Sequence, residues 1–188
     1  MMKKYDDELF SDYYEDDRLQ AVVMPFTMNF ARPSSMLVIL PRGDNMTAVE
    51  NSLDAMNLTA IRASLRRNIV YIDIPRYRVE KGYQLQSVLG DMGMPTAFSG
   101  SADFSGIDGS QDLSISAIVH KAFINVYEEG AEAAAGTAGH VETAMMAGPT
   151  PEPHRIYYFV ADHPFIFIIQ DQETGNILFI GRMMNPNI

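Results

Sequence analysis

Histidine and cysteine are the residues best suited to metal binding and nucleophilic chemistry, and their numbers and spacing here tell against both. The four histidines are His120, His140, His154 and His163. None of them forms the HExxH pattern, in which two imidazoles share one helix face and bind zinc. The chain has no cysteine, so it can form neither a disulfide framework nor a thiolate metal site. We therefore expect no metal site.

The motifs of common enzyme classes are missing as well. The sequence contains no GxSxG nucleophile elbow, no GxxxxGK[ST] phosphate loop and no GxGxxG dinucleotide loop. Aspartates and glutamates number 24, but nothing in their spacing pairs two carboxylates as an acid and a base. His163, within DHPF, is better explained as a structural residue than as a ligand. The residues predict neither an enzyme nor a bound cofactor.

Length and charge narrow the class further. The chain has 188 residues, 47% of them hydrophobic, which suits one domain with a real core. Its formal net charge of −10 argues against a nucleic-acid binder, which would carry a basic face. No stretch approaches the roughly 20 apolar residues of a membrane span. The first ten residues, MMKKYDDELF, lack the apolar core of a secretory signal. We expect neither a nucleic-acid nor a membrane partner.

The hydrophobic pattern predicts a mixed α+β fold. The run at 36–40, MLVIL, is continuously apolar and predicts a strand buried on both faces. Thr47, with Glu50 at capping-box spacing, and Thr59 are candidate starts of two short helices. Further strands are predicted at 19–26, 68–79 (interrupted by Pro75), 113–127, 164–169 and 177–181, a helix at 83–92, and an acidic strand edge or loop at 6–17. Because the strands come in runs, the sheet should be largely antiparallel.

One stretch resists this assignment: residues 128–146, EEGAEAAAGTAGHVETAMM. Its alanines and glutamates favour a helix, but Gly130, Gly136 and Gly139 each cost about 1 kcal/mol in a helix interior. Composition alone favours a linker.

Four segments resemble the serpin family of protease inhibitors, in the family's order. LSISAIVHKAFINVYEEGAEAAAGT resembles the strand and hinge that lead into the serpin reactive-centre loop, and YQLQSVLGDMGMPTAFSGSADFSGI the helix and loop before that strand. LVILPRGDNMTAVENSL resembles a serpin strand followed by short helices, and FVADHPFIFIIQDQETGNILFIGRMMNP the C-terminal signature and last two strands. The resemblance covers essentially the whole chain.

The resemblance implies that residues 1–188 are the C-terminal portion of a single serpin domain, with mostly antiparallel strands of sheets A, B and C. Residues 128–158 would be the hinge and reactive-centre loop, and residues 159–188 the C-terminal strands. A serpin is about twice this long, so the N-terminal half of the fold, with any signal peptide, would lie outside this chain. The family implies an extracellular or secreted location.

The resemblance assigns the hinge residue by residue. The matching positions are Glu128, Glu129, Gly130, Ala131, Glu132, Ala133, Ala134, Ala135, Gly136 and Thr137. Ala131 stands where inhibitory members usually have threonine, and Gly136 stands in place of an alanine. His120 matches a buried histidine that helps control the opening of sheet A.

As an inserted strand, which the family implies, the hinge would alternate its side chains between two faces. One face carries only small or apolar residues: Ala131, Ala133, Ala135, Thr137, Gly139, Val141 and Thr143. Every charge falls on the other face: Glu132, Ala134, Gly136, Ala138, His140, Glu142 and Ala144. A strand that buries one face and exposes the other needs this division, whereas a linker does not.

Counting seventeen residues from Glu128, as the family does, places the scissile bond at Ala144–Met145. Thr143, Met145 and Met146 are alternatives for the residue before the bond, whereas Arg155 lies too far along for normal insertion. A small residue or methionine at this position implies an elastase-like or chymotrypsin-like target.

The resemblance implies a serine protease inhibitor that acts as a suicide substrate. Its partner would be the target protease, joined in a covalent acyl complex, and no residue of this chain would be catalytic. Two alternatives stay open: a non-inhibitory serpin, such as a carrier or chaperone, and an inactive serpin fragment.

Overall fold

The computed structural model describes residues 2–3, 10–26, 33–127 and 155–186. These residues form two compact units. The larger unit comprises Met1–Tyr77 and Val126–Ile188, and the smaller comprises Arg78–Asn125. Each unit is described separately below.

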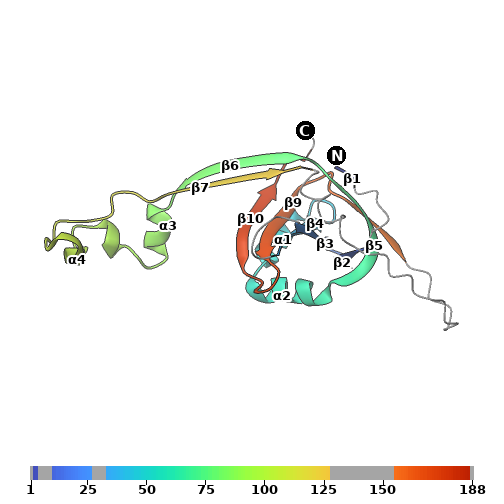
Figure 1. Ribbon diagram of the computed structural model, residues 1–188, viewed down its shortest axis with the longest axis horizontal. Helices are drawn as coiled ribbons and strands as arrows, with labels where there is room; N and C mark the ends of the chain where they lie inside the picture. Colours follow the sequence, from blue (N-terminus) through green and yellow to red (C-terminus); the bar gives the residue numbers. More distant parts are fainter. Residues whose placement is uncertain (1, 4–9, 27–32, 128–154, 187–188) are drawn as a thin grey trace. The chain divides into compact units, whose positions relative to one another are not determined.

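An eight-stranded sheet forms the larger unit (Figure 1). Its strands are β1 (Met2–Lys3), β2 (Phe10–Glu15), β3 (Leu19–Phe26), β4 (Ser34–Pro41), β5 (Arg66–Ile74), β8 (Ile156–Val160), β9 (Phe165–Asp171) and β10 (Ile177–Met183). Their order is β1-β5-β2-β3-β4-β9-β10, with β8 paired to β5 off this path. Strands β5 and β8 run parallel, and the other described pairs in this sheet are antiparallel. The prediction of a largely antiparallel α+β fold is confirmed.

Two helices cover one face of the central strands: α1 (Met46–Ser52) and α2 (Ala55–Ser64). Apolar residues that alternate along β3, β4 and β9 point toward these helices and form one buried cluster with them. Its members are Leu19, Ala21, Leu37, Ile39, Met46, Val49, Leu58, Ile61, Ile166 and Ile168. Burial of this apolar face is the main term that stabilises the helices, since both are short for independent stability.

The opposite face of the same strands is buried by aromatic residues. The Tyr77 ring packs edge-on against Phe165 and at a tilt against Phe167, with centroids 5.8 Å and 5.4 Å apart. Its hydroxyl donates to Met36 Sδ at 3.4 Å, and burial raises the pKa of this phenol above its ordinary value. The run at 36–40 is therefore buried on both faces, as predicted.

Both helices begin earlier than their predicted capping residues. Helix α1 starts at Met46, after Asn45, and shows no side-chain cap, so the capping box at Thr47 was wrong. Helix α2 is capped by Asp54, whose carboxylate accepts from the Asn57 N–H at 2.8 Å. Thr59 lies inside this helix and donates its hydroxyl to the Ala55 carbonyl instead. Asp54 takes the capping position because it precedes the first helical turn.

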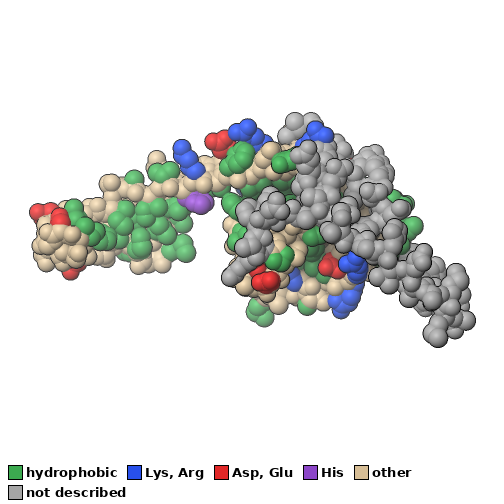
Figure 2. Space-filling model, viewed as in Figure 1, with side chains coloured by type: hydrophobic (Ala, Val, Ile, Leu, Met, Phe, Trp, Pro, Cys, Tyr) green, Lys and Arg blue, Asp and Glu red, His purple; other side chains and the backbone are tan. Residues whose placement is uncertain are grey.

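The smaller unit joins a two-stranded sheet to short helices. Strands β6 (Tyr77–Gln84) and β7 (Val119–Val126) pair, and α3 (Gln86–Asp91), η1 (Thr96–Phe98) and α4 (Ser105–Asp108) lie between them in sequence. On the visible face, hydrophobic side chains gather around α3 (Figure 2).

The strand predicted at 113–127 is shorter in the structure. Only Val119–Val126 forms β7. Its partner β6 ends at Gln84, so the residues before Val119 have no strand to pair with in the described part of the chain. Isolated backbone hydrogen bonds hold them instead: the Leu85 N–H donates to the Ile118 carbonyl, and the Ile115 N–H donates to the Ala97 carbonyl.

Candidate functional site

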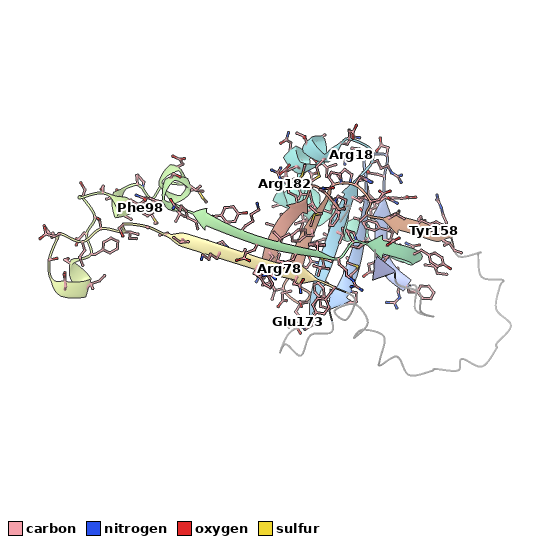
Figure 3. The ribbon with its side chains drawn as sticks, turned by 90° about the horizontal axis from the view of Figure 1, so that it is seen from above. Arg18, Arg78, Phe98, Tyr158, Glu173 and Arg182 are labelled. Atoms are coloured by element: carbon pink, nitrogen blue, oxygen red, sulfur yellow. The ribbon has the colours of Figure 1, made fainter. Side chains whose placement is uncertain are left out.

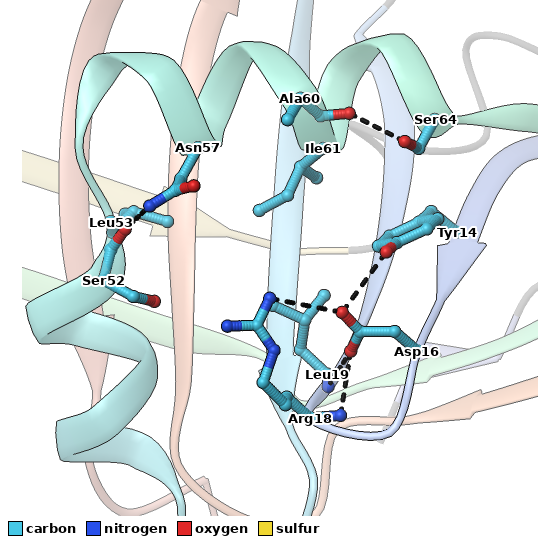
Figure 4. Close-up of a pocket in the computed structure, with 10 residues that line it drawn as sticks. All are labelled: Tyr14, Asp16, Arg18, Leu19, Ser52, Leu53, Asn57, Ala60, Ile61 and Ser64. Carbon is cyan, nitrogen blue, oxygen red and sulfur yellow. Dashed lines mark hydrogen bonds and ion pairs between the residues drawn. The ribbon is translucent and has the colours of Figure 1, made fainter.

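A cavity of about 80 Å³ opens beside α2 and the turn between β2 and β3 (Figure 4). The residues that line it are Tyr14, Asp16, Arg18, Leu19, Ser52, Leu53, Asn57, Ala60, Ile61 and Ser64. Ligand pockets usually enclose about 300 Å³ or more. This cavity is too small for a drug-sized ligand.

The one carboxylate in that cavity is already used by the fold. Asp16 accepts from the backbone N–H groups of Arg18 and Leu19, each at 2.8 Å, and from the Tyr14 hydroxyl at 3.2 Å. Burial opposes its ionisation, but these hydrogen bonds together lower the pKa of Asp16 below its ordinary value. Asp16 therefore stabilises the turn between β2 and β3 and has a structural role.

Other kinds of site have no candidate in the described part of the chain. There, no three histidine, cysteine, aspartate or glutamate side chains gather closely enough to hold a metal ion. Nor does any helix among the described residues combine the length and apolarity needed to cross a membrane.

The predicted hinge, residues 128–137, and the predicted scissile bond, Ala144–Met145, lie outside the described residues. The structure does show the two ends to which this segment is joined. On the near side, β7 ends at Val126, which is buried, and Tyr127 follows it. On the far side, Arg155 leads directly into β8.

Strand β8 is held in the sheet by parallel pairing with β5, in a register that runs from Ile69↔Ile156 to Asp73↔Val160. Phe159 is fully buried, and Ala161, the first residue after the strand, donates its N–H to the Asp73 carbonyl at 2.8 Å. Residues 156–158, which we assigned to the loop, therefore belong to this strand. The run of β-branched and aromatic residues in IYYFV was the local signal for it.

Glu15, at the end of β2, connects Arg155, the residue before β8, to the rest of the sheet. Its carboxylate lies 2.7 Å from an Arg42 guanidinium nitrogen and 3.6 Å from one of Arg155. Arg42 is fixed in turn, because its Nε donates to the Asp16 carbonyl at 2.8 Å. Sequence reasoning missed this cluster, since Glu15 and Arg155 are far apart along the chain.

Buried hydrogen bonds support the same carboxylate from inside the sheet. Tyr13, only 2% exposed, donates its hydroxyl to Glu15 at 2.9 Å and accepts from Gln20 Nε2 at 2.7 Å. Gln20 also donates to the Tyr158 carbonyl at 3.1 Å, which ties β3 to β8. Burial, the largest effect, raises the pKa of Tyr13 above its ordinary value, so this phenol stays a neutral donor.

Aromatic contacts complete the attachment of β8. The Arg155 guanidinium lies 5.0 Å from the centre of the Tyr157 ring, and Tyr157 packs against Tyr13 with centroids 4.6 Å apart. On the other face of the strand, Tyr158 stacks on Tyr71 at 5.3 Å and stays largely exposed (Figure 3). Polar, ionic and aromatic contacts thus converge on the start of β8 and on Arg155, the residue before it.

His120 does not have the buried environment that the resemblance implies. It lies exposed on β7, and its ring stacks near Tyr83 with centroids 6.4 Å apart. The two-stranded sheet of the smaller unit is too small to enclose it. Its role in sheet opening stays a prediction.

His163 is structural, as predicted, and makes two hydrogen bonds. Its Nε2 lies 2.7 Å from the Pro41 carbonyl and its Nδ1 lies 2.7 Å from the Asp162 carboxylate. Both partners accept, so the doubly protonated imidazolium satisfies both. Burial lowers the pKa of His163, but these two bonds and the charges of Asp162 and Asp44 raise it further, so the net shift is upward.

A pH dependence follows from the raised pKa of His163. The stabilisation that the imidazolium provides should be fully present below the unfolded pKa, about 6.5, and lost as the pH rises through the higher folded value. We expect the free energy of unfolding of the wild type, relative to His163→Gln, to fall over this window in urea titrations. Asp162→Asn should flatten the dependence, and a difference that grows with pH would contradict the assignment.

Comparisons with known proteins agree on one family. The family model for serpin (serine protease inhibitor) matches residues 1–186. An uncharacterised serpin-like protein of Thermococcus kodakarensis is 45% identical over 174 residues, covering 93% of this chain and 39% of the relative. Leukocyte elastase inhibitor A of Rattus norvegicus is 40% identical over 187 residues, covering 95% and 47% respectively.

Solved structures show the same fold. The structure of thyroxine-binding globulin in complex with thyroxine superposes with a TM-score of 0.76 at 24% identity, covering 98% of this chain and 46% of that one. The chain therefore spans less than half the length of each of these three proteins.

Proposed function

Because the chain belongs to the serpin family, we propose that it is the C-terminal part of an inhibitor that serine proteases attack as a suicide substrate. The single observation that carries the inhibitory form of this proposal is the hinge sequence. Its small-residue face, from Ala131 to Thr143, can enter a sheet without burying a charge. Non-inhibitory members of the family typically carry bulky or charged hinge residues.

The chemistry belongs to the protease. Its serine oxygen forms an ester with the carbonyl carbon of Ala144, and Met145 leaves as a new amino terminus. The freed hinge then inserts as a strand. Fourteen residues in a strand span about 48 Å, so the attached protease would be carried a comparable distance and its active site distorted before the ester hydrolyses.

The target class follows from the residues at the bond. Alanine at 144 and methionine at 145 suit an elastase-like or chymotrypsin-like protease better than a trypsin-like one. The rat relative, 40% identical, is named as an inhibitor of leukocyte elastase, which supports this choice.

We expect residues 1–188 alone not to inhibit. Insertion requires a larger sheet beside β7, and β7 pairs only with β6 in the described part of the chain. The edge strand β10 also exposes Leu178 and Ile180, each more than half accessible, and exposed apolar edges favour aggregation.

The test is incubation of the full-length form with elastase, chymotrypsin and trypsin, with residues 1–188 alone in parallel. We expect an SDS-stable complex between the full-length form and elastase or chymotrypsin, and a C-terminal peptide that begins at or near Met145. Cleavage of the full-length form without formation of a complex would contradict the inhibitory proposal and favour a non-inhibitory serpin.

A further inference from the structure

The contacts that converge on Arg155 form a defined cluster, which we call the Glu15 clamp. Its members are Tyr13, Glu15, Gln20, Arg42, Arg155 and Tyr157. They come from four strands or strand ends, β2, β3, β4 and β8, all within the larger unit. Arg155 directly precedes β8, so the clamp lies at the C-terminal end of the predicted loop.

The carboxylate of Glu15 is held in place by partners other than Arg155. Arg42 binds it at 2.7 Å and is itself tied to the Asp16 carbonyl, while the buried Tyr13 hydroxyl binds the same carboxylate oxygen at 2.9 Å. Its other oxygen is the one that lies 3.6 Å from Arg155. The site that receives Arg155 is therefore preorganised, and forming the pair orders only the arginine.

Arg155 by itself is weakly restrained. Its side chain is 75% exposed, and an exposed ion pair gains little in water. The Tyr157 ring under its guanidinium adds a second contact, and Tyr157 is itself packed on the buried Tyr13. The two contacts together define where the chain joins the sheet, while leaving the junction easy to loosen by mutation.

We propose that Glu15 is a positioning residue for the reactive loop: through Arg155 it fixes the point and direction in which the loop joins β8. The proposal rests on the function proposed above, because it assigns that role to the segment between Tyr127 and Arg155. A loop attached at two fixed points samples fewer conformations than one with a frayed end. A protease then meets the scissile bond more often in a geometry it can attack.

The experiment uses the full-length form and four variants: Glu15→Gln, Arg155→Gln, Arg155→Lys and the double Glu15→Gln/Arg155→Gln. Glutamine at 15 keeps an acceptor for Tyr13 and removes the charge. The matched control is Glu50→Gln, which breaks another exposed carboxylate–arginine pair, between α1 and Arg182 on β10, away from β8.

Two quantities are measured. The first is amide hydrogen exchange of Ile156–Val160, and the second is the rate constant for cleavage of the loop at Ala144–Met145 by elastase. Exposed ion pairs are worth at most about a factor of five in an equilibrium. We expect exchange about two- to five-fold faster and cleavage slower by a similar factor in Glu15→Gln and in Arg155→Gln. Arg155→Lys should be close to wild type, and the double variant no worse than either single one.

The outcomes separate this inference from the proposed function. The clamp is overturned if amide hydrogen exchange in β8 has the same rate in three variants: Glu15→Gln, Arg155→Gln and the control Glu50→Gln. Faster exchange with unchanged loop cleavage overturns the positioning role. A wild type that is cleaved but forms no SDS-stable complex defeats the inhibitory function alone, since both measurements can still be made. If Glu15→Gln fails to fold, Arg155→Gln gives the same two readouts.

Discussion

Under the proposed function, replacing Ala133 by arginine in the full-length form should convert it from an inhibitor into a substrate. Ala133 lies on the small-residue face of the predicted inserted strand, and an arginine there would bury an unpaired charge. That burial costs several kcal/mol, and each 1.4 kcal/mol is about ten-fold in a ratio of rates. We therefore expect the yield of SDS-stable complex to fall at least about ten-fold. Cleavage at Ala144–Met145 should continue, because the bond lies eleven residues further along.

The neighbouring residue supplies the matched control. Ala134 has the same side chain and the opposite face, so an arginine there would point to solvent after insertion. Ala134→Arg should keep most of the complex yield. Equal losses in the two variants would show that the hinge does not insert with the predicted parity, and no loss in either would argue against insertion itself.

Gly181→Ala should destabilise the sheet core strongly. Gly181 on β10 lies opposite Phe167 on β9, and a Cβ at position 181 would clash with the Phe167 ring. Phe167 is only 1% exposed and packed against Tyr77, so its ring has little room to move. Overpacking of this kind costs about 1–3 kcal/mol, or roughly 2–4 °C in Tm per kcal/mol for a protein of 150–250 residues. Urea and thermal unfolding would measure it.

Two further variants test the cause. Phe167→Leu should recover part of the loss in the Gly181→Ala background, because it removes the atoms that the new methyl group meets. Gly90→Ala serves as the control, since a Cβ there meets nothing within 4 Å and α3 gains a better helix former. Gly181→Ala with wild-type stability would falsify the packing argument.

The sequence alone was sufficient where a structure depends on local pattern. The run MLVIL, with apolar residues at every position, predicted a strand covered on both sides, and β4 is buried by helices on one face and by Tyr77 with Phe165 and Phe167 on the other. Pro75 separated β5 from β6 as predicted, because proline lacks the donor that a sheet ladder needs. Capping was predicted less well: the sequence analysis chose Thr59, whereas Asp54, which precedes the first turn, caps α2.

The family was likewise predicted from the sequence, because motif order is a property of consecutive residues, and the family model confirms it. The hinge and the scissile bond stay predictions from the sequence. His120 shows the limit of such transfer, because burial depends on which elements surround a residue, and here β7 has only β6 beside it among the described strands.

What only the tertiary structure decided is how the far end of the loop is attached. Strand β8 pairs with β5 in parallel across more than eighty residues of sequence, and the register of such a pair depends on the whole sheet. The Glu15–Arg155 contact depends on that register, as does the stacking of Tyr157 on Tyr13. Sequence patterns carry the preferences of neighbouring residues, whereas contacts between distant residues exist only once the sheet has closed around them.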